Sequence, residues 1–343
     1  MNGLLTALIT VIVFMFIILV HEFGHFIAAK AVGVTVHEFS IGFGPVIWKK
    51  QGKSTLYSLR LFPIGGFVKL EGEDESSDDP GALNNKPAWK RLIVMAAGAT
   101  FNLILGLIVF IGIYANTPEF PTLKIGEFID EAKSTATVEV LQQGDEIVSF
   151  NGKRVYYYND LSFMGSMKKD DSPINLTIKR AGHYMDVTVN PVRLGERYLI
   201  GIEAQKEPVG FWGAIKYGVM ETFFTMRLVI YSLGMLITGE VGISDMSGPV
   251  GASTVIGQAA SAGALSLFNI FAMLSVNVGL FNLIPFPALD GGRIFFLLIE
   301  MIRRKPIPPE KEGMVHFIGL ILLLILMVFV TSSDIYKLFL PKG

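Results

Sequence analysis

The chain has 343 residues, of which 51% are hydrophobic and only 17% are charged, and this balance is typical of a membrane protein rather than a soluble enzyme. Its net charge of −1 provides no overall field that would attract nucleic acid, so no nucleic-acid partner is expected. The absence of cysteine excludes disulfides and thiolate metal sites, so any bound metal ion would need His, Asp or Glu ligands.

Four stretches are long and apolar enough to cross about 30 Å of hydrocarbon. The first, residues 1–20, lacks the basic start and the small-residue cleavage site of a signal peptide, so we expect it to remain as a helix. The other three, residues 92–118, 259–289 and 313–333, contain no Asp, Glu, Lys or Arg. The sequence therefore predicts an α-helical membrane protein with four transmembrane helices.

Loop charges indicate how these helices are oriented. Residues 30–91 carry nine Lys and Arg, so the positive-inside rule places this loop in the cytoplasm and residues 119–210 outside. Residues 211–238 are apolar in bulk but contain Lys216, Glu221 and Arg227. A fifth crossing there would move the basic loop at 293–311 outside, against the rule. We therefore expect residues 206–258 to form an interfacial amphipathic segment, with a deeper position of 211–238 as the alternative.

Two β-rich regions lie between the predicted helices. Residues 34–72 predict a membrane-associated β-hairpin on the cytoplasmic side, which either pairs its free edge with an extended peptide or only caps the helices. The acidic residues 71–86 that follow are expected to be mobile. Residues 119–205 alternate apolar and polar side chains around turns at Asn151-Gly152 and Ala181-Gly182, with a helix at 157–168, and predict a small extracytoplasmic α+β domain.

That domain resembles a PDZ domain of bacterial proteases in the stretch "LQQGDEIVSFNGKRV", residues 141–155. It departs from them at "ATVEVLQQGD", residues 136–145, where the usual small-residue step before Gly-Asp is absent. The expected division of the chain is thus 1–118 with the first two spans and the hairpin, 119–205 as a PDZ-like insertion, 206–258 at the interface, and 259–343 with the last two spans.

The first predicted helix ends in "HEFGH", residues 21–25. Residues four apart project from one face of a helix, so His21 and His25 are close enough to bind one ion, while Glu22 lies about 100° around the helix. This arrangement binds Zn²⁺ through two imidazoles and uses the Glu as general base. The alternative is a polar cluster satisfied by neighbouring helices, but ionisable groups at membrane depth are costly and imply a partner. The remaining histidines, His37, His183 and His316, lie in no such pattern.

A catalytic zinc site generally has three protein ligands and leaves a position for water. The third predicted span ends in "NVGLFNLIPFPALDGGR", residues 277–293, in which Asp290 is the only acid. Its prolines and the Gly291-Gly292 pair break the helix, and broken backbone at membrane depth is tolerated only inside protein or beside a wet cavity. The predicted topology places "HEFGH" and Asp290 at the same cytoplasmic level, so Asp290 is the candidate third ligand.

Together, "HEFGH" and "NLIPFPALDGG" resemble the motifs of the site-2 protease family of intramembrane zinc metalloproteases, in particular bacterial relatives of the regulator of sigma-E protease with a single PDZ-like domain. "FSIGFGP", "FPIGGFVKLEGED" and "SGPVG" also match in the expected order, whereas the family's "AAGP" is here "AAGATFN" with Ala99 for proline. The resemblance implies that His21, His25 and Asp290 are zinc ligands and that Glu22 is the general base. It further implies that Asn282 holds the substrate or the developing oxyanion, a helix–helix hydrogen bond being the alternative for this residue.

The leading hypothesis is hydrolysis of peptide bonds in or near the transmembrane segments of single-span proteins, such as anti-sigma factors or remnant signal peptides. The enzyme would lie in the bacterial cytoplasmic (inner) membrane, with the active site toward the cytoplasm and the PDZ-like domain outside. A polytopic transporter with polar midplane residues is an alternative, but it predicts inverted repeats with matching broken helices, and the sequence shows one broken helix. A zinc-binding scaffold without catalysis is a third hypothesis, against which Glu22 argues.

Overall fold

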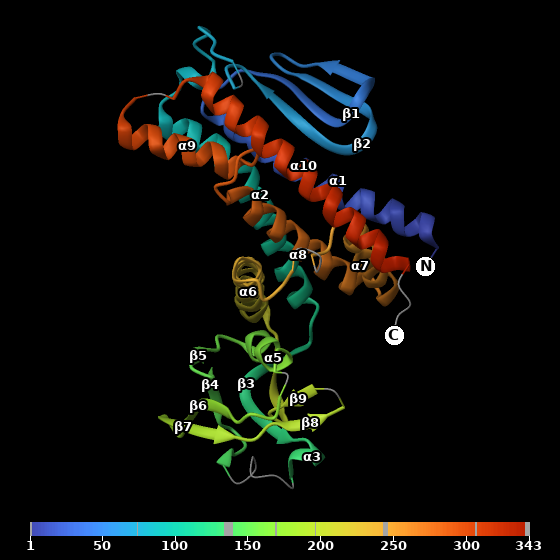
Figure 1. Ribbon diagram of the computed structural model, residues 1–343, viewed down its shortest axis with the longest axis vertical. Helices are drawn as coiled ribbons and strands as arrows, with labels where there is room; N and C mark the ends of the chain where they lie inside the picture. The colour runs from blue at the N-terminus through green and yellow to red at the C-terminus, as the bar shows by residue number, and fades with distance from the viewer. Residues whose placement is uncertain are drawn as a thin grey trace. The chain divides into compact units, whose positions relative to one another are not determined.

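The computed structural model describes residues 2–73, 75–133, 140–168, 170–195, 197–242, 246–305 and 307–339 (Figure 1). By its internal contacts the chain divides into two compact units, residues 1–109 together with 225–343, and residues 110–224. Five helices in the described residues are long and apolar enough to cross a membrane: α1 (Gly3–Ala31), α2 (Ala88–Ala115), α6 (Phe211–Thr238), α8 (Ala264–Leu283) and α10 (Pro309–Phe339). The chain is a multi-pass membrane protein that also contains β-sheets.

The long helices expose apolar side chains that only lipid can cover favourably. On α10, for example, Ile318, Leu322 and Ile325 are all exposed, as are most residues of the same helix around them. A contiguous apolar surface of this kind is unfavourable in water and is expected where a helix contacts hydrocarbon. The predicted membrane character is therefore confirmed at the level of side-chain exposure.

The predicted hairpin is confirmed. Strands β1 (Val36–Gln51) and β2 (Leu56–Leu70) pair antiparallel, with register shifts along the ladder. Strand β2 packs on α1, and a core that includes Ala29, Val36 and Leu70 joins the hairpin to the helices. The strands that follow the "HEFGH" helix are thus held beside it by apolar burial.

The described residues of the acidic segment 71–86 are linked by side-chain hydrogen bonds, and the expected mobility of the segment stays a prediction. Ser77 donates to the Glu71 carboxylate, and Asn84 and Asn85 both donate to the Ser77 carbonyl. The 3₁₀ turn η1 (Leu83–Asn85) buries Leu83 against the core. Composition signals a solvated loop but does not reveal that its polar side chains satisfy one another.

The unit at residues 110–224 contains a small mixed domain with its own core. The main sheet has the strand order β10-β3-β4-β6-β7, with β5 paired to β4, and β8 and β9 form a separate ladder. The bounds are β3 (Glu119–Phe128), β4 (Glu146–Phe150), β5 (Lys153–Arg154), β6 (Ile174–Arg180), β7 (His183–Val189), β8 (Val192–Leu194), β9 (Arg197–Leu199) and β10 (Ile202–Pro208), with helices α3 (Asp130–Lys133) and α5 (Tyr158–Ser166). Ile125, Ile147 and Ile178 are almost completely buried at its centre.

The turns and the helix predicted for this domain are present. Asn151-Gly152 and Ala181-Gly182 have positive φ at both residues, as two-residue hairpin turns require, and α5 lies within the predicted range 157–168. Burial raises the pKa of Asp145, but the hydrogen bonds and charge of the Arg180 guanidinium, together with a hydrogen bond from the Gln142 backbone N–H, hold the pKa below its usual range. The PDZ-like identity stays a prediction, and residues 136–139 of the "ATVEVLQQGD" stretch lie outside the described residues.

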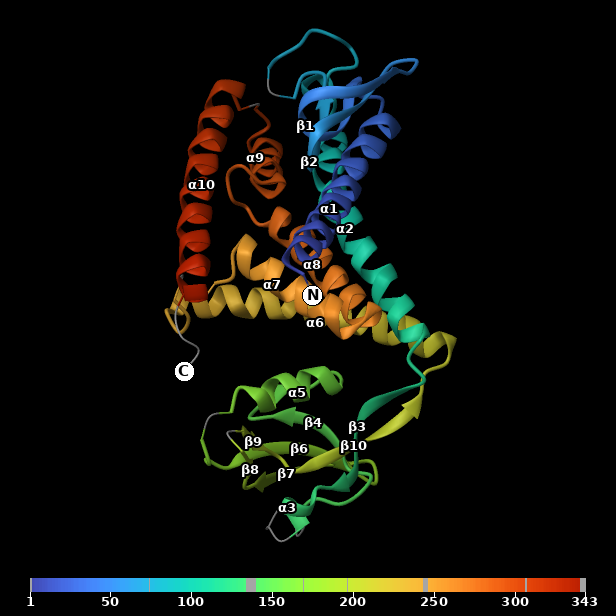
Figure 2. The ribbon, with the colours of Figure 1, turned by 90° about the vertical axis from the view of Figure 1, so that its right-hand side faces the viewer.

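The predicted span at residues 259–289 is divided at two points, of which the break near the prolines was expected and the break at Gly263 was not. Helix α7 (Pro249–Ala262) ends at Gly263, whose φ of 124° leaves the helical region, and α8 ends at Leu283 before the prolines. Helix α9 (Asp290–Arg303) then begins at Asp290, beside the first half of α10 (Figure 2). The expected interfacial segment 206–258 contains α6 and the start of α7, and its position in the membrane stays a prediction.

Candidate metal centre

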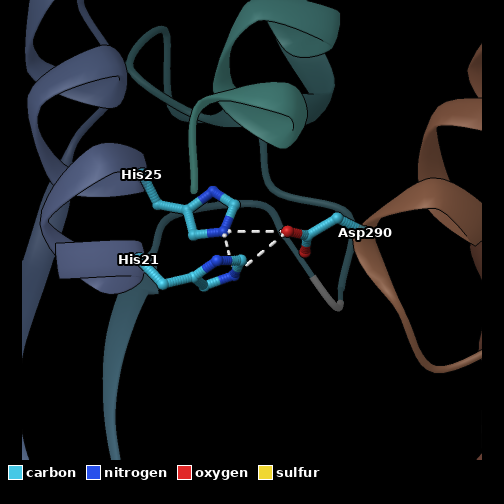
Figure 3. Close-up of side chains that lie close together, drawn as sticks. All are labelled: His21, His25 and Asp290. Atoms are coloured by element: carbon cyan, nitrogen blue, oxygen red, sulfur yellow. Dashed lines mark hydrogen bonds and ion pairs between the residues drawn. The ribbon is translucent and has the colours of Figure 1, made fainter. Parts of the chain in front are cut away.

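Three side chains from two distant segments meet at one point (Figure 3). Nε2 of His21 and Nε2 of His25, both on α1, lie 3.1 and 3.2 Å from Oδ2 of Asp290 at the start of α9. The two Nε2 atoms are 3.2 Å apart. The structure therefore brings together the three residues predicted from the sequence as ligands, while their role as ligands stays a prediction.

The donor set fits a zinc ion. Ligand atoms about 2.0–2.1 Å from a tetrahedral zinc ion lie roughly 3.3 Å from one another, close to the separations observed here. Oδ2 of Asp290 is buried and receives no hydrogen bond from the residues that the structure describes, although it lies at ion-pair distance from both imidazoles. A buried acceptor facing two ring nitrogens is satisfied by a cation bound between them, and two imidazoles with one carboxylate suit zinc.

Helix α2 orients both histidine rings. His25 donates from Nδ1 to the Val94 carbonyl at 2.8 Å, which leaves the Nε2 lone pair free for a metal ion. Asn102 is fully buried, and its side-chain amide nitrogen lies 3.4 Å from Nδ1 of His21. Its side-chain oxygen Oδ1 has no hydrogen-bond partner among the described residues. Rotating this amide by 180° would let the oxygen accept Nδ1–H of His21 and likewise free Nε2. Asn102 was not predicted as a site residue, because only the packing of α2 on α1 reveals its neighbour.

Glycines let α2 approach this closely. A Cβ on Gly98 would lie 2.4 Å from Nε2 of His25, and one on Gly24 would lie 2.6 Å from the Ala97 carbonyl oxygen. Ala99, which replaces the family proline, is fully buried, and its carbonyl faces Gly279 of α8. The replacement therefore lies at a helix–helix contact and touches none of the three candidate ligands.

A cavity of about 1100 Å³ opens beside the three candidate ligands. Glu22 lines it and lies next to Gly66 of β2, where an added Cβ would be 3.6 Å from Cγ of Glu22, at ordinary contact distance. Hydrogen bonds from Ser77 and His37 hold the pKa of Glu71, which also lines the cavity, below its usual range. The cavity is thus polar, holds an ionised carboxylate and has room for an extended peptide segment.

Asn282 is not among the described residues that line this cavity. Its side-chain amide donates to the Val278 carbonyl at 3.0 Å, one turn earlier in α8. Because α8 ends at Leu283, the spacing of eight residues from Asp290 does not place both on one helix face. The side chain makes an intrahelical hydrogen bond rather than the helix–helix bond considered as the alternative, and its substrate role stays a prediction.

Comparisons with known proteins show similarity over nearly the whole chain. The sequence profile of peptidase family M50 matches residues 9–326. A relative in Clostridium acetobutylicum is 40% identical over 331 residues, covering 95% of this chain and 96% of that protein. The zinc metalloprotease RasP of Geobacillus kaustophilus is 32% identical over 415 residues, covering 96% of this chain and 97% of that protein. The regulator of sigma-W protease RasP of Bacillus subtilis is 30% identical over 423 residues, covering 98% and 99%.

Proposed function

This chain belongs to peptidase family M50, and on that premise we propose that it is an intramembrane zinc endopeptidase. The observation that carries the proposal is the convergence of His21, His25 and Asp290 beside Glu22 in one cavity of a membrane protein. Relatives named as zinc metalloproteases cover nearly its whole length, which supports zinc as the metal. We propose His21, His25 and Asp290 as the ligands.

Each residue of the site has its own proposed role in peptide hydrolysis. Bound zinc supplies a Lewis acid that polarises a carbonyl and lowers the pKa of water toward 7. Glu22 accepts the proton from the attacking water and returns it to the leaving amine, and its place in the same cavity as the ligands supports this role. Val94 and Asn102 hold the imidazoles in the orientation that keeps Nε2 toward the ion. Asn282 would reach a substrate only if its intrahelical bond is exchanged for one to the peptide.

The direction of α2 supports the proposed topology of four crossings. Its residue Ala97 lies against Gly24 of α1, whereas Asn102, further along α2, reaches back to His21. As the residue number rises on α2 it falls on α1. The two helices are therefore antiparallel.

Helices α2 and α8 are antiparallel as well. Ala99 faces Gly279, whereas Gly106 faces Ala272. Helices α1 and α8 consequently run in the same direction. Between two spans of the same direction the chain must cross back once, and α2 provides that crossing. Helix α6 would then remain at one face of the membrane. This supports the interfacial placement of residues 211–238.

Single-span membrane proteins are the proposed substrates, cut near the cytoplasmic face of the bacterial cytoplasmic membrane. A transmembrane helix hides its carbonyls, so it must become extended before attack, and the open edge of the β1–β2 hairpin next to α1 can pair with such a strand. The sigma-W regulation in the name of the B. subtilis relative makes anti-sigma factors reasonable first candidates, with remnant signal peptides as the other class. The PDZ-like domain would lie outside and restrict access of bulky substrates.

Cleavage of a purified single-span protein tests the proposal directly. The Glu22→Gln variant should lose on the order of 10²–10⁴-fold in rate while still binding one zinc ion per chain, because the substitution removes the base and no ligand. Chelation should abolish cleavage, and added zinc should restore it.

Glu127→Gln is the matched control, since this exposed glutamate lies in the soluble domain. It should cleave at the wild-type rate. Equal cleavage by the wild type, the Glu22→Gln variant and the chelated sample would overturn the proposal.

A further inference from the structure

The turn directly before Asp290 contains a residue in an unfavourable backbone conformation. Leu289 donates to the Phe286 carbonyl at 3.2 Å, closing a β-turn with Pro287 in second place and Ala288 in third. The φ of Ala288 is +79°, which makes this a type II turn, and that position normally belongs to glycine. A non-glycine residue remains in this region only when its surroundings hold it there.

Helix α10 supplies those surroundings. Nδ1 of His316 accepts the backbone N–H of Ala288 at 2.9 Å. One turn further along the same face, Gly319 touches Pro287, and a Cβ on Gly319 would lie 2.4 Å from Cβ of that proline. The turn is therefore held between a hydrogen bond to Ala288 and close packing on Pro287.

The hydrogen bond defines the state of the His316 ring. Nδ1 can accept from a backbone N–H only through its lone pair, so the proton of the neutral ring is on Nε2. Nε2 lies 3.8 Å from Oε1 of Glu312, and the ring packs against Phe296 of α9. A Cβ on Gly292 would lie 3.2 Å from the same ring. His316 thus bonds the backbone at Ala288 and lies close to Gly292, on either side of Asp290 in the chain.

We propose that His316 is a positioning residue for the metal centre, which fixes the Ala288 turn and thereby sets the Asp290 carboxylate against His21 and His25. This inference rests on the proposed function, because it presumes that Asp290 is a ligand. Without an acceptor at position 316, Ala288 would relax out of the left-handed region and carry Oδ2 of Asp290 away from the two Nε2 atoms. Residues that orient metal ligands in this way typically account for 10–100-fold in metal affinity.

Zinc affinity of the full-length protein in detergent, measured by competition with a chromogenic chelator, tests the proposal. His316→Phe keeps a ring but removes the acceptor, and it should weaken zinc binding about 10–100-fold. His316→Asn places an amide oxygen where Nδ1 lies, and it should bind zinc nearly as tightly as the wild type. His183→Phe, an exposed histidine of the soluble domain, is the matched control and should have no effect.

A second variant separates positioning from a general loss of folding. Glycine adopts a φ of +79° without strain, so the double variant Ala288→Gly/His316→Phe should recover much of the zinc affinity that His316→Phe loses. A misfolded protein would not be rescued by removing one methyl group.

The outcomes distinguish this inference from the proposed function. Wild-type protein that binds no zinc would overturn the proposed function and this inference with it. Wild-type protein that binds zinc, together with a His316→Phe variant of equal affinity, would overturn the inference alone. An Asn variant as weak as the Phe variant, or a double variant without recovery, would also overturn it.

Discussion

At the scale of single residues, Gly98 is the position at which the smallest change should most disturb the metal centre. A Cβ added there would lie 2.4 Å from Nε2 of His25 and 2.8 Å from Nε2 of His21, closer than such atoms can approach. The His25 ring cannot move away without losing its hydrogen bond to the Val94 carbonyl. We expect Gly98→Ala to weaken zinc binding by roughly tenfold or more, measured by chelator competition.

Gly112→Ala on the same helix is the control for this prediction. A Cβ at Gly112 meets no described atom within 4 Å, so the substitution should leave zinc binding unchanged. Because alanine favours a helix over glycine, it should also stabilise the protein by about 0.5–1 kcal/mol. If both alanine variants bind zinc like the wild type, contact between α2 and the imidazoles does not control the site.

The sequence predicts the residues of this site unequally well. His21, Glu22 and His25 follow from local helix spacing, and Asp290 follows from being the only acid in a broken span at the same expected depth. Asn102, Gly98 and His316 carry no such signal, because their roles depend on which helix faces pack together. Tertiary contacts of this kind leave no periodic pattern in one sequence.

At the scale of secondary-structure elements, helix α7 begins at a carboxylate supplied by another helix. Oδ2 of Asp334, on α10, accepts the backbone N–H groups of Gly248 and Gly251 at 2.9 and 2.8 Å. These glycines belong to the "SGPVG" motif, and a Cβ on Gly248 would lie 2.9 Å from the same oxygen. The motif thus forms a helix start whose backbone N–H groups bind a buried side-chain carboxyl oxygen.

Replacing Asp334 should therefore destabilise the contact between α7 and α10. Loss of a cap of this kind typically costs about 0.5–2 kcal/mol, so Asp334→Ala should lower the free energy of unfolding by that amount, and Asp334→Asn by less. Denaturant unfolding in detergent, followed by intrinsic fluorescence, measures the change. Ser332→Ala is the control, since that exposed hydroxyl bonds only its own helix, and an equal loss there would exclude the capping role.

Hydropathy predicts where apolar helices lie, but it does not predict where they break. Residues 259–289 form one uninterrupted apolar run, yet the structure divides it at Gly263 and again after Leu283. Pro285 and Pro287 indicate the second break in the sequence, whereas hydropathy gives no sign of the first. The β-hairpin was predictable because alternation and turn residues are local signals. The hydrogen bonds within the acidic segment 71–86 were not predictable, because composition alone marks the side chains that form them as solvated.

At the scale of the whole molecule, the number of membrane crossings decides on which side each loop lies. Five helices satisfy the length and hydropathy of a span among the described residues, whereas the parallel directions of α1 and α8 favour four crossings. The difference rests on α6 alone. If α6 does not cross, both of its ends lie outside, and the loop that holds Asp290 returns to the cytoplasmic side with the end of α1.

Cysteine labelling distinguishes the two topologies, because the natural chain has no cysteine and single replacements give no background. Ser76, Ser172 and Glu240 are all exposed and lie before α2, within the soluble domain and after α6. With four crossings, a membrane-impermeant maleimide should label cysteine at 172 and 240 in intact cells, and at 76 only after permeabilisation. Five crossings would move position 240 to the cytoplasmic side, and α8 would then run opposite to α1. Protection of the cysteine at 240 in intact cells would therefore contradict the proposed topology.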